Sequence, residues 1–337
     1  MGICISSASS EIHGSEAQDD HENVTVFEGS VDPLGAKRLG SVYSKQGSKG
    51  LNQDAAVLYE GYGEEDGAFC GVFDGHGKNG HVVSKIVRNC LPSLLLSQQH
   101  ALEKTRIADD PDTRIQSRNT ESQFAVNKWR EACISAFRVM DKEIKLQENL
   151  DFSCSGTTAV VVLRQGEDLV IANLGDSRAV LGTITENGIR AVQLTRDLKP
   201  GIPSEAERIR KCNGRVIALK EEPHIQRVWL PHEDTPGLAM SRAFGDFLLK
   251  DYGVIAIPDI NHRQLNSNDQ FVVIATDGVW DVLSNNQVAS MVWAAESEET
   301  AAKAVVDAAV AAWKNRFPSS KVDDCTAVCL FLKNKKQ

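Results

Sequence analysis

The sequence predicts an α+β domain in which strands and helices form separate layers. Short apolar, β-branched runs recur along the chain, and each has the length of a strand and is bounded by turn residues. Some of these runs follow one another like the strands of hairpins, and long helical stretches lie apart from them. This arrangement favours a layered α+β domain over a doubly wound parallel sheet.

The apolar periodicity places the elements in order along the chain. The expected strands are Phe69–Phe73, Thr158–Leu163, Leu169–Leu174, Ala179–Leu181, Phe271–Ala275 and Thr326–Leu332. The expected helices are Gly80–Leu96, Phe124–Gln147, Ser204–Lys211, Ser284–Ala295 and Glu298–Lys314. Ser284 and Gln287 have the spacing of a capping box, which marks a helix start. The polar stretch Gln98–Gln123 indicates a surface insertion in a helical hairpin.

Composition excludes several classes of protein. The 337 residues carry a net charge of −9, which argues against non-specific binding to nucleic acid because that binding needs clustered positive charge. No apolar run approaches the roughly 20 residues that span a bilayer. The eight cysteines include no C-x-x-C pair, and several lie in apolar runs. We therefore expect reduced, packed thiols and a cytoplasmic protein.

The N-terminal segment differs from the rest. Residues 1–34 are expected to form a flexible acidic tail, and residues 35–333 one domain. The tail up to Ala36 accounts for −7 of the net charge, which leaves −2 for residues 37–337. The opening Met-Gly-Ile-Cys-Ile-Ser matches the pattern for myristoylation of Gly2. One myristoyl chain anchors only marginally, so Cys4 is the candidate second anchor, by palmitoylation, on the cytoplasmic face of the plasma membrane.

Aspartates stand at the ends of several expected strands. Asp74-Gly75-His76 follows Phe69–Phe73, Asp277 follows the run that ends at Thr276, and Asp176 follows Leu169–Leu174 with one glycine between. Asp54 and the pair Asp323-Asp324 directly precede two other apolar runs. A single Asp-Gly is usually a turn signal. If five strand ends with aspartates share one sheet edge, however, their carboxylates lie close together and repel one another.

A hard divalent cation would relieve that repulsion. Oxygen ligands without a His/Cys cluster favour Mg²⁺ or Mn²⁺ over zinc, and several aspartates suggest two ions suited to attack on a phosphoryl group. His76 follows a candidate ligand in a glycine-flanked turn that should leave it exposed, which suits a general acid for the departing alkoxide.

These residues and others form an ordered set that resembles the metal-dependent type-2C serine/threonine protein phosphatases over about residues 35–333. The Met-Gly-x-Cys start is similar to plant-type members of that family. The matching blocks are Gln46-Gly47 with Asn52-Gln53-Asp54, Val72–Gly77, Ser155–Ala159, Ala172–Ala179, Leu194–Pro200, Ser241–Asp246, Ala275–Asp281 and Asp323–Thr326.

The resemblance implies a four-layer αββα sandwich, that is, a central antiparallel β-sandwich flanked by helices, with a two-ion Mg²⁺/Mn²⁺ centre. It implies that Asp74, Gly75, Asp277 and Asp323 ligate the ions and that Asp54 holds a metal-bound water. Water would attack phosphorus without a phospho-enzyme, and His76 would protonate the leaving oxygen. Asp176 and Asp281 resemble a weaker third metal site, and residues 197–238 correspond to a flap beside the active site.

Two departures from the family pattern bear on activity. Gln53 stands where the family commonly has Glu, and Lys49 takes the place of the phosphate-binding Arg, which weakens the expected hold on phosphate. The alternative function is therefore a catalytically weak protein that sequesters a kinase at a membrane. Asp324 competes with Asp323 as ligand, and alignment favours Asp323. The expected partners are phosphoproteins, including a kinase, and the expected state is a monomer.

Overall fold

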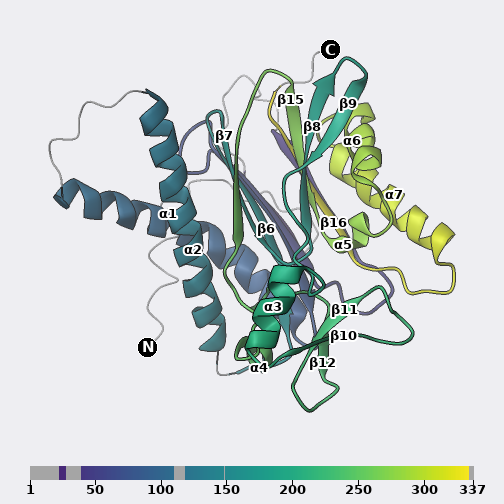
Figure 1. Cartoon of the computed structure of the whole chain (residues 1–337). Coiled ribbons are helices and arrows are strands. Elements are labelled where there is room, and N and C mark those ends of the chain that lie inside the picture. Colours follow the sequence, from purple (N-terminus) through teal and green to yellow (C-terminus); the bar gives the residue numbers. More distant parts are fainter. Residues whose placement is uncertain (1–22, 28–38, 110–117, 148, 334–337) are drawn as a thin grey trace.

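The computed structural model describes residues 23–27, 39–109, 118–147 and 149–333. Two β-sheets pack face to face, with helices on both outer faces (Figure 1). The larger sheet has eight strands, and its main path runs β1-β3-β4-β6-β7-β14, with β5 and β13 joined beside β4. These strands are β1 (Val24–Phe27), β3 (Asp54–Glu60), β4 (Ala68–His76), β5 (Gly156–Thr157), β6 (Ala159–Gln165), β7 (Asp168–Leu174), β13 (Phe244–Gly245) and β14 (Asp259–Gln264).

The second sheet has five strands in the order β2-β16-β15-β8-β9, all antiparallel. They are β2 (Gly40–Lys45), β8 (Arg178–Thr185), β9 (Gly188–Gln193), β15 (Asp269–Ala275) and β16 (Cys325–Phe331). The larger sheet is antiparallel too, except that β1 lies parallel to β3. The predicted strands are therefore confirmed, and they lie within an antiparallel β-sandwich.

Alternating apolar side chains explain why four layers form, because each sheet buries both of its faces. One cluster between the sheets includes Leu58, Val72 and Ile274. A second joins the larger sheet to α1 (Gly80–Asp109) and α2 (Arg118–Lys145), and a third joins the smaller sheet to α6 (Asn285–Ala294) and α7 (Ala301–Arg316). This is the predicted four-layer αββα sandwich.

A small unit lies at one end of the sandwich (Figure 1). It contains α3 (Pro203–Lys211) and a three-stranded sheet of β10 (Arg215–Ala218), β11 (Gln226–Trp229) and β12 (Pro236–Leu238). Two short helices, α4 (Phe247–Lys250) and α5 (Asp277–Trp280), lie near the same end. Ile209, Val228 and Leu249 share a separate apolar core, so this unit has packing of its own.

Some predicted boundaries were wrong. Val24–Phe27 belongs to β1 rather than to a tail, because its register with Ala56–Tyr59 extends the larger sheet. Helix α1 continues to Asp109 and α2 begins at Arg118, so helix occupies much of the polar insertion. Helix α7 begins at Ala301 rather than Glu298, whereas the capping box of Ser284 and Gln287 is confirmed. None of the described helices is long and apolar enough to cross a membrane.

Candidate metal centre and active site

Four of the predicted aspartates lie together at one end of the sandwich. The register of β3 and β4 pairs Asp54 with Asp74. Asp277 follows β15, and Asp323 comes just before β16, the antiparallel neighbour of β15. The hydroxyl of Thr276 donates to Asp54 Oδ2 at 2.8 Å, which ties the two sheets together at this point. The strand ends converge, but they come from the two facing sheets and not from one edge of a single sheet, as the sequence analysis supposed.

The charges of this cluster oppose one another. Burial and the nearby Asp277, Asp54 and Asp323 raise the pKa of Asp74 well above its usual range. Burial, Asp176 and Asp323 do the same to the pKa of Asp277. Burial raises the pKa of Asp54 to about 7, although a hydrogen bond with Thr326 opposes the shift. Such a site favours either protons or a bound cation.

A second acidic group adjoins the first. Asp176 lies just beyond β7, and Asp281 ends the short helix α5. Burial raises the pKa of both; the charge of Asp281 adds to the shift at Asp176, and the charge of Asp323 adds to the shift at Asp281. Oδ1 of Asp176 is buried without a hydrogen-bond partner, while Lys199 Nζ lies 3.7 Å from its Oδ2. These are the two residues predicted to form a weaker third metal site.

Asp323 and Asp324 are neighbours in the chain but make different contacts. Asp324 accepts hydrogen bonds from the backbone N–H groups of Gly47 and Gln53 at 2.8 and 2.9 Å, so it fixes the loop between β2 and β3. Asp323 instead pairs with the ammonium of Lys49 and acts on the pKa of Asp74 and Asp277. This division favours Asp323 over Asp324 as the ligand.

Lys49 is held by the acidic cluster itself. Burial would lower the pKa of Lys49, but its hydrogen bond to Asp323 and the charges of Asp323, Asp277 and Asp74 leave it raised. Lys49, which we expected in place of a phosphate-binding arginine, therefore lies at the acidic cluster. Its charge partly balances the aspartates.

The residues fit a hard divalent cation. Among the described residues, no group of three His, Cys, Asp or Glu side chains is arranged as a metal site. The available donors are carboxylate oxygens, and Oε1 of Gln53 is buried nearby without a hydrogen-bond partner. Gly75 must be glycine, since a Cβ there would lie 2.5–2.6 Å from the carbonyl oxygens of Gly80 and Gln53. Oxygen-only chemistry suits Mg²⁺ or Mn²⁺.

His76 lies beside this cluster but not in the exposed turn that we predicted. It is the last residue of β4, because pairing with Gly156 of β5 extends the strand, and its side chain is only 20% exposed. Its Nε2 lies 2.6 Å from Oδ2 of Asp246, and its buried Nδ1 has no partner. Burial would lower the pKa of His76, but the charge and hydrogen bond of Asp246 leave it raised.

Asp246 is the partner of His76 that sequence reasoning missed. It lies 170 residues from His76 in the chain and is 1% exposed. Its φ of 49° is left-handed, a strained conformation that clusters at functional sites. The backbone N–H of Asp246 donates to Ser155 O at 2.9 Å, which helps to hold it there. The sequence offered one signal, the Gly-Asp end of the block Ser241–Asp246, but no role for it.

Comparisons with known proteins identify the family of the chain. Residues 40–314 match the family described as protein phosphatase 2C. The chain belongs to this family. It is a phosphatase of the metal-dependent serine/threonine class, as the match with the whole length of named relatives also shows.

The similar phosphatases include one named "Probable protein phosphatase 2C 72" from Arabidopsis thaliana, which is 56% identical over 100% of this chain and 99% of its own. "Probable protein phosphatase 2C 12" from Oryza sativa subsp. japonica is 49% identical over 98% of this chain and 92% of its own. The crystal structure of serine-threonine phosphatase 2C from Toxoplasma gondii has a TM-score of 0.77 and 27% identity, and the match covers 87% of this chain and 94% of that one.

In this phosphatase the predicted flap is the small unit with α3 and β10–β12. A buried ion cluster joins it to the body, because Glu205 on α3 accepts hydrogen bonds from Arg208, Ser241 and Arg242. Arg242 also donates to the carbonyl of Ile257 at 2.9 Å. Burial opposes ionisation of Glu205, yet these donors lower its pKa to about 2.

The remaining predicted features lie partly outside the described residues. Gly2 and Cys4 are there, so the predicted acylation stays a prediction. The seven described cysteines are unpaired, as expected for reduced thiols. Trp280 packs beside the site as an anchor, with its indole N–H donating to Ala275 O at 2.8 Å.

Proposed function

We propose that this phosphatase hydrolyses phosphoserine and phosphothreonine at a two-ion Mg²⁺ or Mn²⁺ centre held by Asp74, Gly75, Asp277 and Asp323. Bound ions would neutralise these carboxylates, activate a water as the nucleophile and draw charge from the phosphoryl group. The observation that carries the proposal is the set of buried aspartates gathered at the strand ends, whose pKa values are raised by burial and by their mutual repulsion. Asp176 and Asp281 would hold a weaker third ion.

His76 supplies the proton for the leaving group. In the hydrolysis the P–O bond to the serine or threonine oxygen breaks while a new bond forms between phosphorus and water. Asp246 occupies Nε2 of the ring, so Nδ1, which is buried without a partner, is the atom that would give its proton to the alkoxide. Because His76 bonds a carboxylate and not a hydroxyl or thiol, the site favours direct attack by water over a phospho-enzyme.

Two other side chains orient the reactants. Asp54, fixed by Thr276, is placed to accept a proton or hydrogen bond from water in the cluster. Lys49 is half exposed and can turn toward a phosphate once cations occupy the acidic site. A lysine is a point charge without the bidentate fork of arginine, so phosphate binding should be weaker than an arginine would give.

The alternative of a catalytically weak protein that sequesters a kinase gains no specific support, because the residues proposed for chemistry are present and gathered at one edge. Three predictions remain: that the phosphoprotein substrates include a kinase, that the protein is a monomer, and that Gly2 and Cys4 bring it into peripheral contact with a membrane. A Gly2→Ala variant should leave the membrane fraction in which the native protein is found. Unchanged fractionation would contradict the acylation.

The test of function is release of phosphate from a phosphothreonine peptide as Mg²⁺ or Mn²⁺ is added. Asp74→Asn and Asp277→Asn should each reduce turnover at least about a hundredfold, since each removes charge from the ion-binding cluster. Asp307→Asn is the matched control, because Asp307 is a surface partner of Lys45 and Lys303. Metal-dependent turnover that survives in both site variants would refute the assignment, and metal binding without turnover in the native protein would favour the sequestering alternative.

A further inference from the structure

Two loops lie side by side at the edge of the active site. The first, residues 46–53, joins β2 to β3, and the second, residues 317–324, joins α7 to β16. The backbone N–H of Ser48 donates to Val322 O at 2.8 Å, and the N–H of Val322 donates to Ser48 Oγ at 2.8 Å. Figure 1 shows the second loop returning from the end of α7 toward α5.

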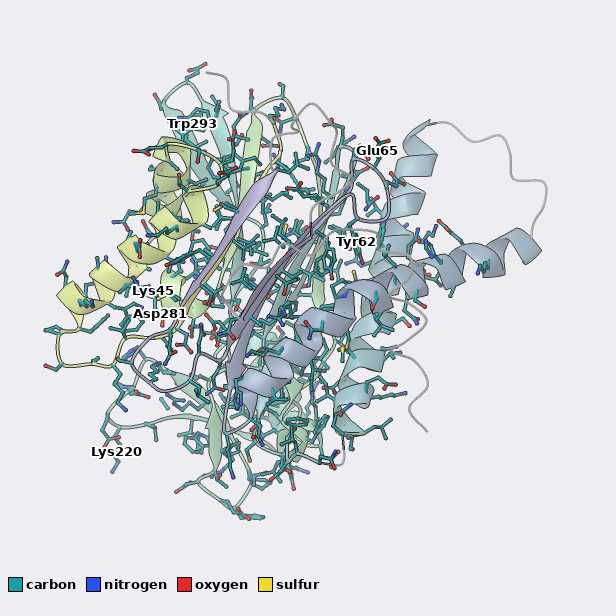
Figure 2. All side chains as sticks on the ribbon, turned by 180° about the vertical axis from the view of Figure 1, so that it is seen from behind. Lys45, Tyr62, Glu65, Lys220, Asp281 and Trp293 are labelled. Carbon is teal, nitrogen blue, oxygen red and sulfur yellow. The ribbon has the colours of Figure 1, made fainter. Side chains whose placement is uncertain are left out.

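The last turn of α7 emerges beside the same loops. Ser41 Oγ accepts from Ala302 N, and Lys45 pairs with Asp307 at 2.9 Å, so β2 and α7 run in the same direction. The residues that follow each element therefore emerge at the same end (Figure 2, where Lys45 is labelled). The indole N–H of Trp313 donates to Gly278 O at 2.7 Å, which places this turn against the helix that carries Asp277.

These segments carry an excess of positive charge, of which Asp323 neutralises the part on Lys49. Residues 46–52 and 308–322 contain four cations and no carboxylate. Lys314, Arg316 and Lys321 are exposed, and none of the three has an ion-pair partner among the residues that the structure describes. We call them the basic ridge. Lys314 and Arg316 lie in the last turn of α7, where positive side chains interact favourably with the helix dipole. Lys321 lies five residues beyond α7, so the helix dipole does not explain its charge.

Two large apolar side chains accompany the ridge. Phe317 is 43% exposed and packs against Trp313 in a tilted arrangement, with ring centroids 5.3 Å apart. Leu51 is 68% exposed, two residues from Lys49. The surface is thus cationic with apolar contacts, and it leads to Lys49, whose ammonium bonds Asp323 in the acidic cluster.

We propose that the basic ridge binds an acidic segment of the phosphoprotein substrate close to the phosphorylated residue. This inference rests on the proposed function, because it assumes that the phosphate enters the cluster beside Lys49. Lys314 and Arg316 lie in the last turn of α7 and Lys321 in the loop that follows, so the ridge offers several cations to the carboxylates of an extended chain. Phe317 and Leu51 offer contacts for an apolar side chain of that segment.

The experiment compares two phosphothreonine peptides that differ only in having Asp and Glu, or Asn and Gln, beside the phosphothreonine. The native enzyme should show a lower KM for the acidic peptide, and added salt should reduce that preference. A variant with Lys314→Gln, Arg316→Gln and Lys321→Gln should lose it. An exposed ion pair changes binding by roughly 1.5- to 5-fold, so the three together should raise KM for the acidic peptide about tenfold.

Controls separate binding from folding. The triple variant should retain kcat for p-nitrophenyl phosphate and KM for the neutral peptide. Replacing Lys104, Arg138 and Lys142, which are exposed on α1 and α2, should leave the preference unchanged. Glutamate at the three ridge positions should create a preference for a lysine-bearing peptide, which a misfolded protein would not show.

Several outcomes would overturn the inference. If the native enzyme hydrolyses both peptides with equal KM values, the basic ridge does not bind an acidic segment. A triple variant that changes only binding to anionic phospholipid vesicles would also overturn the inference. Higher activity of the triple variant toward both peptides would mean that the ridge holds an acidic segment of this chain instead. If native enzyme with Mn²⁺ releases no phosphate from any substrate, the proposed function itself has failed.

Discussion

Replacing Asp246 by asparagine tests how the fold prepares His76 for proton transfer. The substitution keeps the size of the side chain and removes the charge that lies 2.6 Å from His76 Nε2. Hydrogen bonds to a charged group contribute about 1.5–3 kcal/mol, and the Asp246 side chain is only 2% exposed, so little of this is lost to solvent. At about 1.4 kcal/mol for each factor of ten, kcat should fall roughly 10- to 150-fold.

The assay compares two leaving groups. A threonine alkoxide must be protonated as it departs, whereas p-nitrophenolate is stable enough to leave with little help. Asp246→Asn should therefore slow hydrolysis of the phosphothreonine peptide roughly 10- to 150-fold. Hydrolysis of p-nitrophenyl phosphate should slow less than about threefold. Without Asp246, burial lowers the pKa of His76, so the alkaline loss of peptide activity should move to lower pH.

Asp141→Asn is the matched control. Asp141 supports the same segment through the N–H of Gly245 at 3.0 Å and through Lys250, but it does not bond His76. It should reduce stability or slow both substrates alike. Equal losses for both substrates in Asp246→Asn, or an unchanged peptide rate, would refute the role that we assign to Asp246.

The structure makes three other predictions. Asp54 has a raised pKa of about 7 in the folded protein, so the metal-free protein should lose stability as the pH rises from about 4 through 7, by up to about 1.4 kcal/mol per pH unit for this group. Asp54→Asn should reduce this pH dependence in thermal unfolding. A Tm of the native protein that rises over this range would contradict the prediction. Lys49→Gln should strengthen Mn²⁺ binding about twofold to fivefold by calorimetry, because it removes a cation that competes at Asp323. The same variant should be inhibited less by phosphate, because it lacks the ammonium proposed to bind it. Weaker Mn²⁺ binding would count against this. Glu205→Gln should cost about 3–5 kcal/mol in chemical unfolding, since Arg208 and Arg242 would lose a buried charge partner; a loss below 1 kcal/mol would show that the cluster contributes little.

The sequence predicted the layers because burial has a clear signature in strands. Runs such as Phe271–Ala275 and Thr326–Leu332 are apolar throughout, and both are covered by helices on one side and the other sheet on the opposite side. Weakly patterned segments were less predictable. Val24–Phe27 is a strand because β3 offers an edge to pair with, and nothing within those four residues reveals that edge.

The acidic cluster was predictable for the same reason that the strands were. Each aspartate adjoins a recognisable apolar run, so gathering the strand ends gathers the carboxylates. The contacts of His76 were not predictable, because they depend on β5 and β13, which are two residues long, and on the left-handed backbone of Asp246. Long-range contacts between short irregular segments leave little periodicity in a sequence.

The central claim is that the buried aspartates hold two divalent ions. A crystal structure of the full chain grown with Mn²⁺, with anomalous scattering recorded at the manganese edge, tests it most directly. We predict two strong peaks at the cluster, both next to Asp74, with Asp277 and Asp323 beside one of them. A map without peaks at these residues, in crystals of enzyme that Mn²⁺ activates, would contradict the account.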